Sequence, residues 1–322
     1  MASPCGLVMM NKQIYVHKKE SQMKSPMKLG CISSGMKSSV GVGVGRMVKN
    51  GLVYRQNLMI RSFEIGFDGK LSITSLINYL QDTALNHGRM LGIVADGPNL
   101  GITKQMSQRD LIWVLSSLQI LVDHYPSWLD VVEIETWMHP SGQNGLSHDW
   151  IIRDRINGHS VARASSVFVL MNKETRKLSK FINEVREEMA PHMMNCKPIF
   201  DKYTLILPQI DMHSATFARA GLRPGWNDLD VNQHVNNAKY INWILESVPR
   251  SLMEHNQLSV INLKYLRECN MDSEMHSLSK IVTKSYADHD QNQTIELEHL
   301  LRFDKGLQIV SGRTIWKPNK LQ

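Results

Sequence analysis

Two short segments of the chain carry the same apolar stripe at the spacing of a helix. "INYLQDTA", residues 77–84, and "INWILESV", residues 241–248, are offset by 241 − 77 = 164 positions. In the second segment, apolar residues recur at i, i+3, i+4 and i+7, namely Ile241, Ile244, Leu245 and Val248. Ile77, Leu80 and Ala84 repeat this spacing in the first segment. Each stripe predicts a helix that buries one face against a core.

Each predicted helix is followed by segments that are typical of strands. These segments are 110–126, 130–142 and 147–172 after the first helix, and 259–269, 274–287 and 294–318 after the second. Asn157-Gly158 and Lys305-Gly306 interrupt two of them and indicate tight hairpin turns. One long helix followed by several antiparallel strands, occurring twice, predicts an α+β fold of two similar units side by side.

The predicted boundary between the units lies in a segment without regular periodicity. Residues 187–221 contain three prolines and show little periodicity. We therefore expect an N-terminal unit at 51–190, a linker at 191–221 and a C-terminal unit at 222–322. The apolar share of 42% and the charged share of 21% indicate a globular protein. No run approaches the roughly 18 apolar residues of a membrane helix, so we expect no transmembrane span.

The positive charge of the chain is concentrated at its N-terminus. Residues 1–50 hold eight basic residues and one acid, whereas the remainder holds 29 of each, from totals of 37 and 30. The net charge of +7 therefore belongs to the leader and gives no reason to expect nucleic-acid binding. Residues 1–50 are also rich in Ser and Met, which is typical of an organelle transit segment. The alternative is a disordered tail without a targeting role.

The four cysteines lie far apart and form no metal-ligand pair or disulfide framework. We expect no metal and no cofactor, and a reducing compartment fits this pattern.

Short polar residues gather where the second predicted helix begins, in "WNDLDVNQHVNN". Asp230, Asn232 and His234 are spaced by two, so an extended approach to the helix would point all three side chains to one side. An Asn amide and the free N–H groups at a helix start can hold a carbonyl oxygen, and a His can transfer protons near neutral pH. The alternative explanation is helix capping, for which Asp and Asn are common.

The repeat provides an internal comparison for this cluster. Subtracting 164 from the three positions gives Gly66, Asp68 and Lys70 in the first unit. Equivalent positions therefore do not require this polar set, which favours a chemical role for the set in the second unit.

A second pair of candidates lies near the end of a predicted strand. Glu268 and Cys269 are adjacent, so a regular strand would direct their side chains to opposite faces. Cys269 would act as a thiolate nucleophile with His234, whereas Glu268 would activate water. The alternatives are a small buried hydrophobe for Cys269 and a solvated residue for Glu268.

Several segments together resemble the plant acyl-acyl-carrier-protein thioesterases, and their wording is most similar to the FatB type. The segments include "WNDLDVNQHVNNAKYINWILESVP", "YLRECNMDS", "LINYLQDTALNH" and "ASSVFVLMNKETRKLSK", and the resemblance runs from about Val53 to Pro318. It implies a double hot-dog fold, in which the N-terminal unit shapes the acyl pocket and the C-terminal unit carries the catalytic residues. It also implies hydrolysis of saturated, commonly palmitoyl, acyl-acyl carrier protein in the plastid stroma.

Two catalytic schemes are associated with this family. One uses Cys269 as nucleophile, His234 as base and Asn232 as orienting residue. In the other, Glu268 and His234 activate water, Asn232 positions the thioester and Asp230 supports the network. We favour the second, because an acidic neighbour raises the pKa of a thiol.

Other hypotheses remain open at this point. The chain could be a hot-dog acyl-CoA thioesterase or dehydratase, or a fatty-acid carrier without turnover. Acyl carrier protein is the implied partner, and a homodimer is an open alternative. Because acyl carrier protein is acidic, the basic residues of "NKETRKLSK" are a candidate docking patch: Lys173, Arg176, Lys177 and Lys180. An exposed solvated face would account for them equally well.

Overall fold

The computed structural model describes residues 43–94, 101–200, 208, 210–287 and 290–319. Most of the predicted leader lies outside this range. The prediction was wrong for its last residues, since strand β1 (Arg46–Val48) pairs with β2 (Val53–Met59). A Cβ on Gly45 would meet the Tyr54 hydroxyl at 2.0 Å, so this glycine permits a close approach rather than flexibility.

The N-terminal unit contains one long helix, α1 (Ile73–Met90), and a set of antiparallel strands. The strands after α1 are β3 (Leu111–Val122), β4 (Val131–Ser141), β5 (Gly145–Asp154), β6 (Ser160–Asn172) and β7 (Leu178–Ser179). Short helical segments complete the unit: α2 (Lys104–Ser107), α3 (Asn183–Met189) and η1 (Ala190–His192). The predicted Asn157-Gly158 turn connects β5 and β6, where Gly158 has the positive φ that such a turn requires.

The C-terminal unit repeats this order with shorter helices. Its strands are β8 (Phe217–Leu222), β9 (Asn256–Tyr265), β10 (Met275–Ala287), β11 (Asp290–Phe303) and β12 (Gln308–Pro318). Its helical segments are η2 (Trp226–Asp228), η3 (Asn237–Lys239), α4 (Tyr240–Leu245) and α5 (Arg250–His255). The predicted turn at Lys305-Gly306 connects β11 and β12. Strand β8 begins within the segment that we predicted as a linker.

The prediction of a long second helix was wrong. α4 covers six residues, and α5 starts only after Pro249. Proline has no backbone N–H and disfavours helical backbone at the residue before it, so the helix cannot continue through Val248. The apolar stripe is nevertheless buried as expected, because Ile241 and Ile244 are both 0% exposed.

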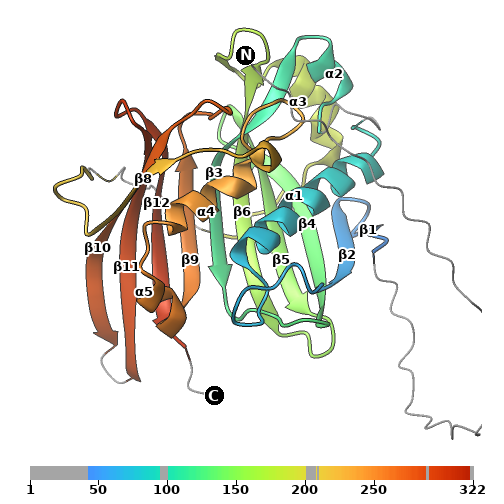
Figure 1. Ribbon diagram of the computed structural model, residues 1–322. Coiled ribbons are helices and arrows are strands. Elements are labelled where there is room, and N and C mark those ends of the chain that lie inside the picture. The colour runs from blue at the N-terminus through green and yellow to red at the C-terminus, as the bar shows by residue number, and fades with distance from the viewer. Residues whose placement is uncertain (1–42, 95–100, 201–207, 209, 288–289, 320–322) are drawn as a thin grey trace, which may run out of the picture. The chain divides into compact units, whose positions relative to one another are not determined.

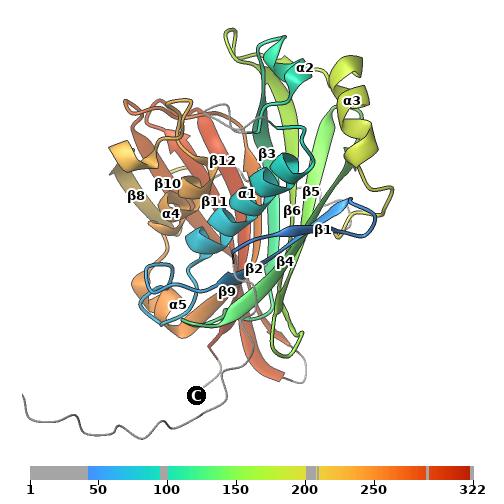
Figure 2. The same ribbon diagram turned by 90° about the vertical axis from the view of Figure 1, so that its right-hand side faces the viewer.

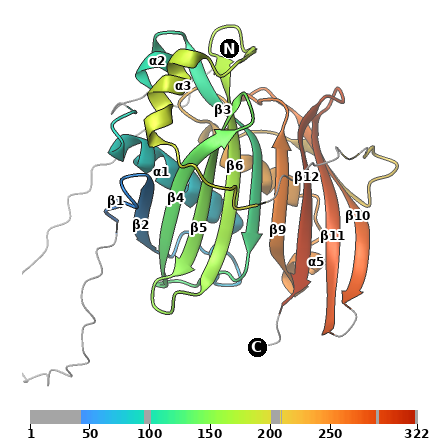
Figure 3. The ribbon, with the colours of Figure 1, turned by 180° about the vertical axis from the view of Figure 1, so that it is seen from behind.

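All of the strands in the described residues belong to one sheet. Its order is β1-β2-β4-β5-β6-β3-β9-β12-β11-β10-β8, and β7 pairs with β6 at one side. The central neighbours β3 and β9 are antiparallel, and their register places Gln119 opposite Asn262. Figures 1 and 2 show α1 and α4 on the same face of this sheet, and Figure 3 shows the strands from the other face.

The two units are related by an approximate twofold axis at the β3–β9 pair. In both units a loop N–H bonds to a carbonyl beyond the strand: Leu71 to Pro126 at 2.8 Å, and Val235 to Cys269 at 2.9 Å. These bonds set an offset of 269 − 126 = 143 between β3 and β9. The Gln119–Asn262 pair shows the same offset, since 262 − 119 = 143, so each residue faces its own counterpart across the axis.

One apolar core extends through both units. Buried residues of α1, α4, β3 and β9 belong to a single cluster that includes Leu76, Ile120, Ile241 and Ile261. Within the described part of the chain, no helix has the length and apolar character needed to cross a membrane.

A buried polar network lies between the C-terminal helices and the sheet. Ser247 bonds to Ser279 at 2.6 Å, and Ser279 bonds to Nδ1 of His299 at 2.7 Å. Nε2 of His299 bonds to the Thr314 hydroxyl, also at 2.7 Å. Burial lowers the pKa of His299 to about 3, so this imidazole is neutral in the folded protein.

At the seam between the units, which is the β3–β9 pair, we predict that shortening a buried side chain lowers stability strongly. Ile261→Ala removes a fully buried side chain from β9, and we expect the free energy of unfolding to fall by about 2–5 kcal/mol. Ile156→Ala is the matched control, because Ile156 is 77% exposed and its loss should change stability by less than about 0.5 kcal/mol. Urea unfolding of both variants measures this difference, and equal effects would contradict a shared core.

His299 predicts a stability that depends on pH. Because its pKa is depressed in the folded state, protons bind preferentially to the unfolded chain below pH about 6.5, and stability falls as the pH drops from there towards 3. Within this range, His299 lowers the free energy of unfolding by about 1.4 kcal/mol for each pH unit. In urea unfolding at pH 7, 6 and 5, the free energy of unfolding of His299→Gln should decline less than that of the original protein. Parallel declines would show that His299 does not supply this dependence.

Candidate active site

The segment that leads into the second helix is a tight turn. Leu229 and Val235 form an isolated bridge, and the Asp230 N–H donates to the His234 carbonyl at 2.7 Å. Oδ1 of Asp230 accepts from the N–H groups of Asn232 at 2.8 Å and His234 at 3.3 Å. Our prediction of an extended approach was therefore wrong. The Asp230 carboxylate folds these residues back on themselves and fixes the loop that carries His234.

The first unit contains the same turn without the polar set. Ile65 and Leu71 form the equivalent bridge, and the Gly66 N–H donates to the Lys70 carbonyl at 2.7 Å. One position has left-handed backbone in both turns, with φ of 72° at Gly69 and 62° at Gln233. A side chain in this conformation costs about 1–2 kcal/mol, so the second turn holds more strain than the first.

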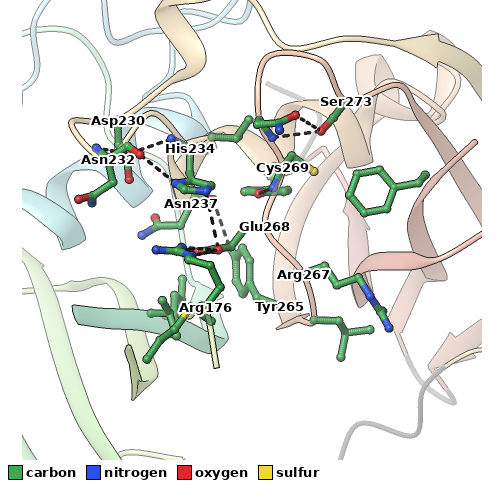
Figure 4. Close-up of a pocket in the computed structure, with 18 of the residues that line it drawn as sticks. Arg176, Asp230, Asn232, His234, Asn237, Tyr265, Arg267, Glu268, Cys269 and Ser273 are labelled. Carbon is green, nitrogen blue, oxygen red and sulfur yellow. Dashed lines mark hydrogen bonds and ion pairs between the residues drawn. The ribbon is translucent and has the colours of Figure 1, made fainter. Parts of the chain in front are cut away.

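The imidazole of His234 has a defined orientation. Its Nδ1 lies 2.9 Å from the carbonyl oxygen of Asn232, and a carbonyl can only accept a hydrogen bond. Nδ1 therefore carries a proton, and in the neutral ring Nε2 is left as the acceptor. Nε2 faces Oε2 of Glu268 at 4.0 Å (Figure 4). The two side chains are about one-third exposed, at 31% and 33%.

Glu268 and Cys269 lie just beyond the end of β9, and their side chains have different environments. Glu268 lines an open cleft, whereas Cys269 is 1% exposed and its Sγ points to Sδ of Met275 at 3.6 Å. Burial, with a smaller contribution from Glu268, raises the pKa of the Cys269 thiol to about 11. By the offset of 143, the first unit has Tyr125 and Pro126 at these positions.

Arg176 from the N-terminal unit completes the site. Its guanidinium forms a salt bridge to both carboxylate oxygens of Glu268, and Nε donates to Oε2 at 3.2 Å (Figure 4). Arg176 was one candidate for a basic docking patch, and its side chain is 29% exposed and paired with Glu268. Lys173, Lys177 and Lys180 are exposed. Sequence reasoning missed the pair because residues 92 positions apart meet only through the β3–β9 seam.

The start of the second helix offers fewer free N–H groups than we expected. Oδ1 of Asn236 accepts from the Ala238 N–H at 2.9 Å, so the helix is capped by its own chain. The side chains of Asn232 and Asn237 line the cavities instead. Asn237 is a second amide that the sequence analysis did not single out, although "NN" precedes the helix.

Two cavities adjoin at this site. A cleft of about 980 Å³ is lined by the candidate residues and by the starts of β3 and the loop after β9. A pocket of about 390 Å³ lies in the N-terminal unit, between α1 and the sheet. Both cavities share five lining residues: Trp113, Leu115, Asp230, Asn232 and Asn237.

The pocket of the N-terminal unit is mostly apolar. Ile77, Leu80 and Ala84 of the α1 stripe face it from the helix. The strands contribute large apolar residues, including Leu118, Met138, Leu146, Trp150 and Phe168. Such a pocket suits a hydrocarbon chain, and its shared wall with the cleft would place one end of that chain beside Asn232.

Two family models match the chain. The model of the acyl-ACP thioesterase N-terminal domain matches residues 51–189, and that of the acyl-ACP thioesterase C-terminal domain matches residues 212–318. Together the two matches cover most of the chain.

Several known proteins are similar over most of the chain. The chloroplastic palmitoyl-acyl carrier protein thioesterase of Arabidopsis thaliana is 47% identical over 274 residues, which are 85% of this chain and 66% of that protein. The chain thus spans slightly less than two thirds of the length of this relative. The chloroplastic dodecanoyl-[acyl-carrier-protein] hydrolase of Cinnamomum camphora is 41% identical, with 84% and 69% covered.

A solved structure shares the fold. The 12:0-ACP thioesterase from Umbellularia californica has a TM-score of 0.78 and 39% sequence identity, with 84% of this chain and 96% of that chain covered. This similarity confirms the predicted double hot-dog arrangement, and the relatives include proteins named FATB. The chain therefore belongs to the acyl-ACP thioesterase family, and its resemblance to the plant FatB type is confirmed.

Proposed function

We propose that this protein hydrolyses the thioester of a saturated long-chain acyl-acyl carrier protein (acyl-ACP) and releases a free fatty acid. The observation that carries this proposal is the position of His234 and Glu268 in the cleft, beside the shared wall of an apolar pocket. The relatives are named as thioesterases and hydrolases of acyl-ACP, which supports the same reaction here.

The space between His234 and Glu268 suits the attacking water. Nε2 of His234 and Oε2 of Glu268 are 4.0 Å apart, too far for a direct hydrogen bond. A water molecule about 2.8 Å from both atoms fits this separation and would bond to both. Since Nδ1 of His234 is occupied by the Asn232 carbonyl, Nε2 is the nitrogen that receives the proton of this water.

The chemistry then follows in two steps. The water oxygen forms a bond to the thioester carbonyl carbon while its proton passes to Nε2 of His234, which gives a tetrahedral intermediate. The carbon–sulfur bond breaks next, and the imidazolium returns the proton to the leaving thiolate. The products are the fatty acid and the free thiol of the carrier. The Glu268 carboxylate stabilises the imidazolium between these steps.

The amide of Asn232 would stabilise the negative charge of the intermediate. Its side chain lines both the cleft and the pocket, where the carbonyl of a bound acyl chain would lie. Asn237 lines the same two cavities and is a second donor of this type. Asp230 has an indirect role, because its carboxylate holds the turn that presents Asn232 and His234.

The scheme with a cysteine nucleophile is less well supported. A thiol with a pKa near 11 and 1% exposure is neither ionised at neutral pH nor open to a substrate. Sγ of Cys269 contacts Sδ of Met275 in the protein interior. We therefore assign Cys269 to packing and Glu268 to the reaction.

The acyl chain would occupy the pocket under α1, and the carrier would dock at the cleft. The basic leader, most of which lies outside the described residues, and the chloroplastic relatives support a plastid location. Palmitoyl is the proposed acyl group, because relatives of this name are among the most similar. Lys173, Lys177 and Lys180 remain candidates for contact with the acidic carrier.

A first prediction of the proposed function concerns the residues that activate water. Glu268→Ala and His234→Ala should each lower kcat on palmitoyl-ACP by about 10²–10⁴-fold, because each removes a group that acts on the transferred proton. Asn232→Ala should lower kcat by about 10²–10³-fold through loss of a donor to the intermediate. Release of the carrier thiol, followed with a chromogenic disulfide, measures all three.

Cys269→Ala is the control for this series, and it should keep substantial hydrolysis. A Cys269→Ala loss as large as that of Glu268→Ala would reverse the assignment. Bound fatty acid with no thiol release from any acyl thioester would instead indicate a carrier. Faster turnover of acyl-CoA, or formation of an enoyl product, would indicate the other hot-dog activities.

The second prediction concerns chain length. Ala84→Phe places a ring in the pocket wall, so the products should shift toward shorter fatty acids. Asn78→Phe is the control, because Asn78 lies on the exposed face of the same helix and should leave the profile unchanged. Gas chromatography of the fatty acids that each variant releases tests this. An unchanged profile in Ala84→Phe would exclude this pocket as the acyl site.

A further inference from the structure

We infer that Arg176 is a positioning residue that holds the Glu268 carboxylate beside His234, so that the active site is assembled from both halves of the chain. The inference rests on the proposed function and extends it to a residue of the opposite hot-dog unit. Its basis is the salt bridge across the β3–β9 seam (Figure 4).

The contact between Arg176 and Glu268 fixes the orientation of the carboxylate. Guanidinium nitrogens reach both oxygens, with the Nε bond at 3.2 Å. A planar guanidinium that engages both oxygens of a carboxylate restricts its rotation more than a single point charge would. His234 also faces this carboxylate, at 4.0 Å, and the thiol of the adjacent Cys269 is a further titratable group beside it.

The backbone around Arg176 is built to present the side chain. The Arg176 N–H donates to the Asn172 carbonyl at 3.0 Å, and the Asn172 N–H donates to the Lys177 carbonyl at 2.9 Å. The Thr175 N–H donates to the Asn172 side chain at 2.8 Å. These bonds close a hairpin between β6 and β7, and Arg176 occupies its left-handed position with φ of 54°. The guanidinium is therefore held by a fixed turn, independently of the substrate.

The hairpin is in turn joined to the catalytic unit by the sheet. β6 pairs with β3, which pairs with β9, and Glu268 follows directly after β9. This path brings the end of β6 to the end of β9. Strand β9 ends at Tyr265, so Glu268 lies in the loop that follows it. The side chain of a loop residue has rotational freedom, which the contact with Arg176 removes.

A positioning role differs from a docking role in measurable ways. The neighbouring Lys173 and Lys177 are exposed, whereas the Arg176 side chain is 29% exposed and engaged with Glu268. A docking residue would affect KM for acyl-ACP and have no effect on a small thioester. A positioning residue would affect kcat on every thioester, because Glu268 acts on the water in each case.

The test compares Arg176→Ala, Arg176→Lys and Arg155→Ala on palmitoyl-ACP and on a carrier-free palmitoyl thioester of N-acetylcysteamine. Arg176→Ala should lower kcat by about 10- to 100-fold on both substrates with little change in KM. The kcat of Arg176→Lys should lie between those of Arg176→Ala and the original protein, since lysine cannot engage both oxygens in one plane. Added guanidinium ion should partly restore the Arg176→Ala variant. Arg155→Ala is the matched control, because Arg155 is an exposed arginine outside the site, and it should keep kcat on both substrates.

A stability measurement accompanies the kinetics. The unfolding midpoints of Arg176→Ala, Glu268→Gln and the double variant should be non-additive, which reports the salt bridge without reference to activity. Additive midpoints, a loss confined to KM on palmitoyl-ACP, or unchanged kcat in Arg176→Ala would each overturn the inference. If the unmodified protein hydrolysed neither substrate, the proposed function itself would fail, which is a separate outcome.

Discussion

The antiparallel pairing of β3 with β9 is the constraint on which the rest of the structure depends. It joins two similar sheets into one and sets an approximate twofold axis at Gln119 and Asn262. Because the two strands run in opposite directions, the end of β9 lies beside the middle of β3. This arrangement brings a hairpin of the first unit to Glu268 of the second and makes α1 and α4 neighbours on one face. Neither the cleft nor the salt bridge would exist in one unit alone.

The two units use the same framework for different purposes. Both contain the turn before the helix, with its bridge and its left-handed residue. The first unit has Lys70 and Tyr125 where the second has His234 and Glu268, and its helix covers an apolar pocket. At the equivalent place the second unit has a buried network of serines and His299. The first unit thus contributes most of the lining of the apolar pocket, and the second unit contributes most of the candidate site residues.

Much of this could be predicted from the sequence, and the failures have physical causes. The periodic stripe at Ile241 and Ile244 located the buried helix face, because burial follows local spacing. Its length was overestimated, since the effect of Pro249 on the preceding turn was not considered. Gly45 fell within the predicted leader, although a glycine is required there by the close approach of Tyr54. That contact depends on tertiary packing, which no local pattern records.

The candidate site shows the same division between local and long-range information. The D-x-N-x-H pattern and the Glu268-Cys269 pair stood out because their chemistry is local. The shape of the turn did not, since it depends on hydrogen bonds from the Asp230 carboxylate to the backbone. Arg176 was identified as basic, but its partner lies 92 positions away and is set by sheet topology. Single-sequence reasoning therefore singled out candidate residues that lie around one cleft, but it did not predict all of their contacts.

The internal twofold axis has a consequence for how such a protein can change. In a symmetric homodimer, every substitution appears twice, so a residue that improves one site alters the other in the same way. Here the two related halves are encoded separately, and a replacement such as glutamine for glycine in one turn leaves its counterpart untouched. Two related halves within one polypeptide can therefore differ from each other in sequence while they keep the same architecture.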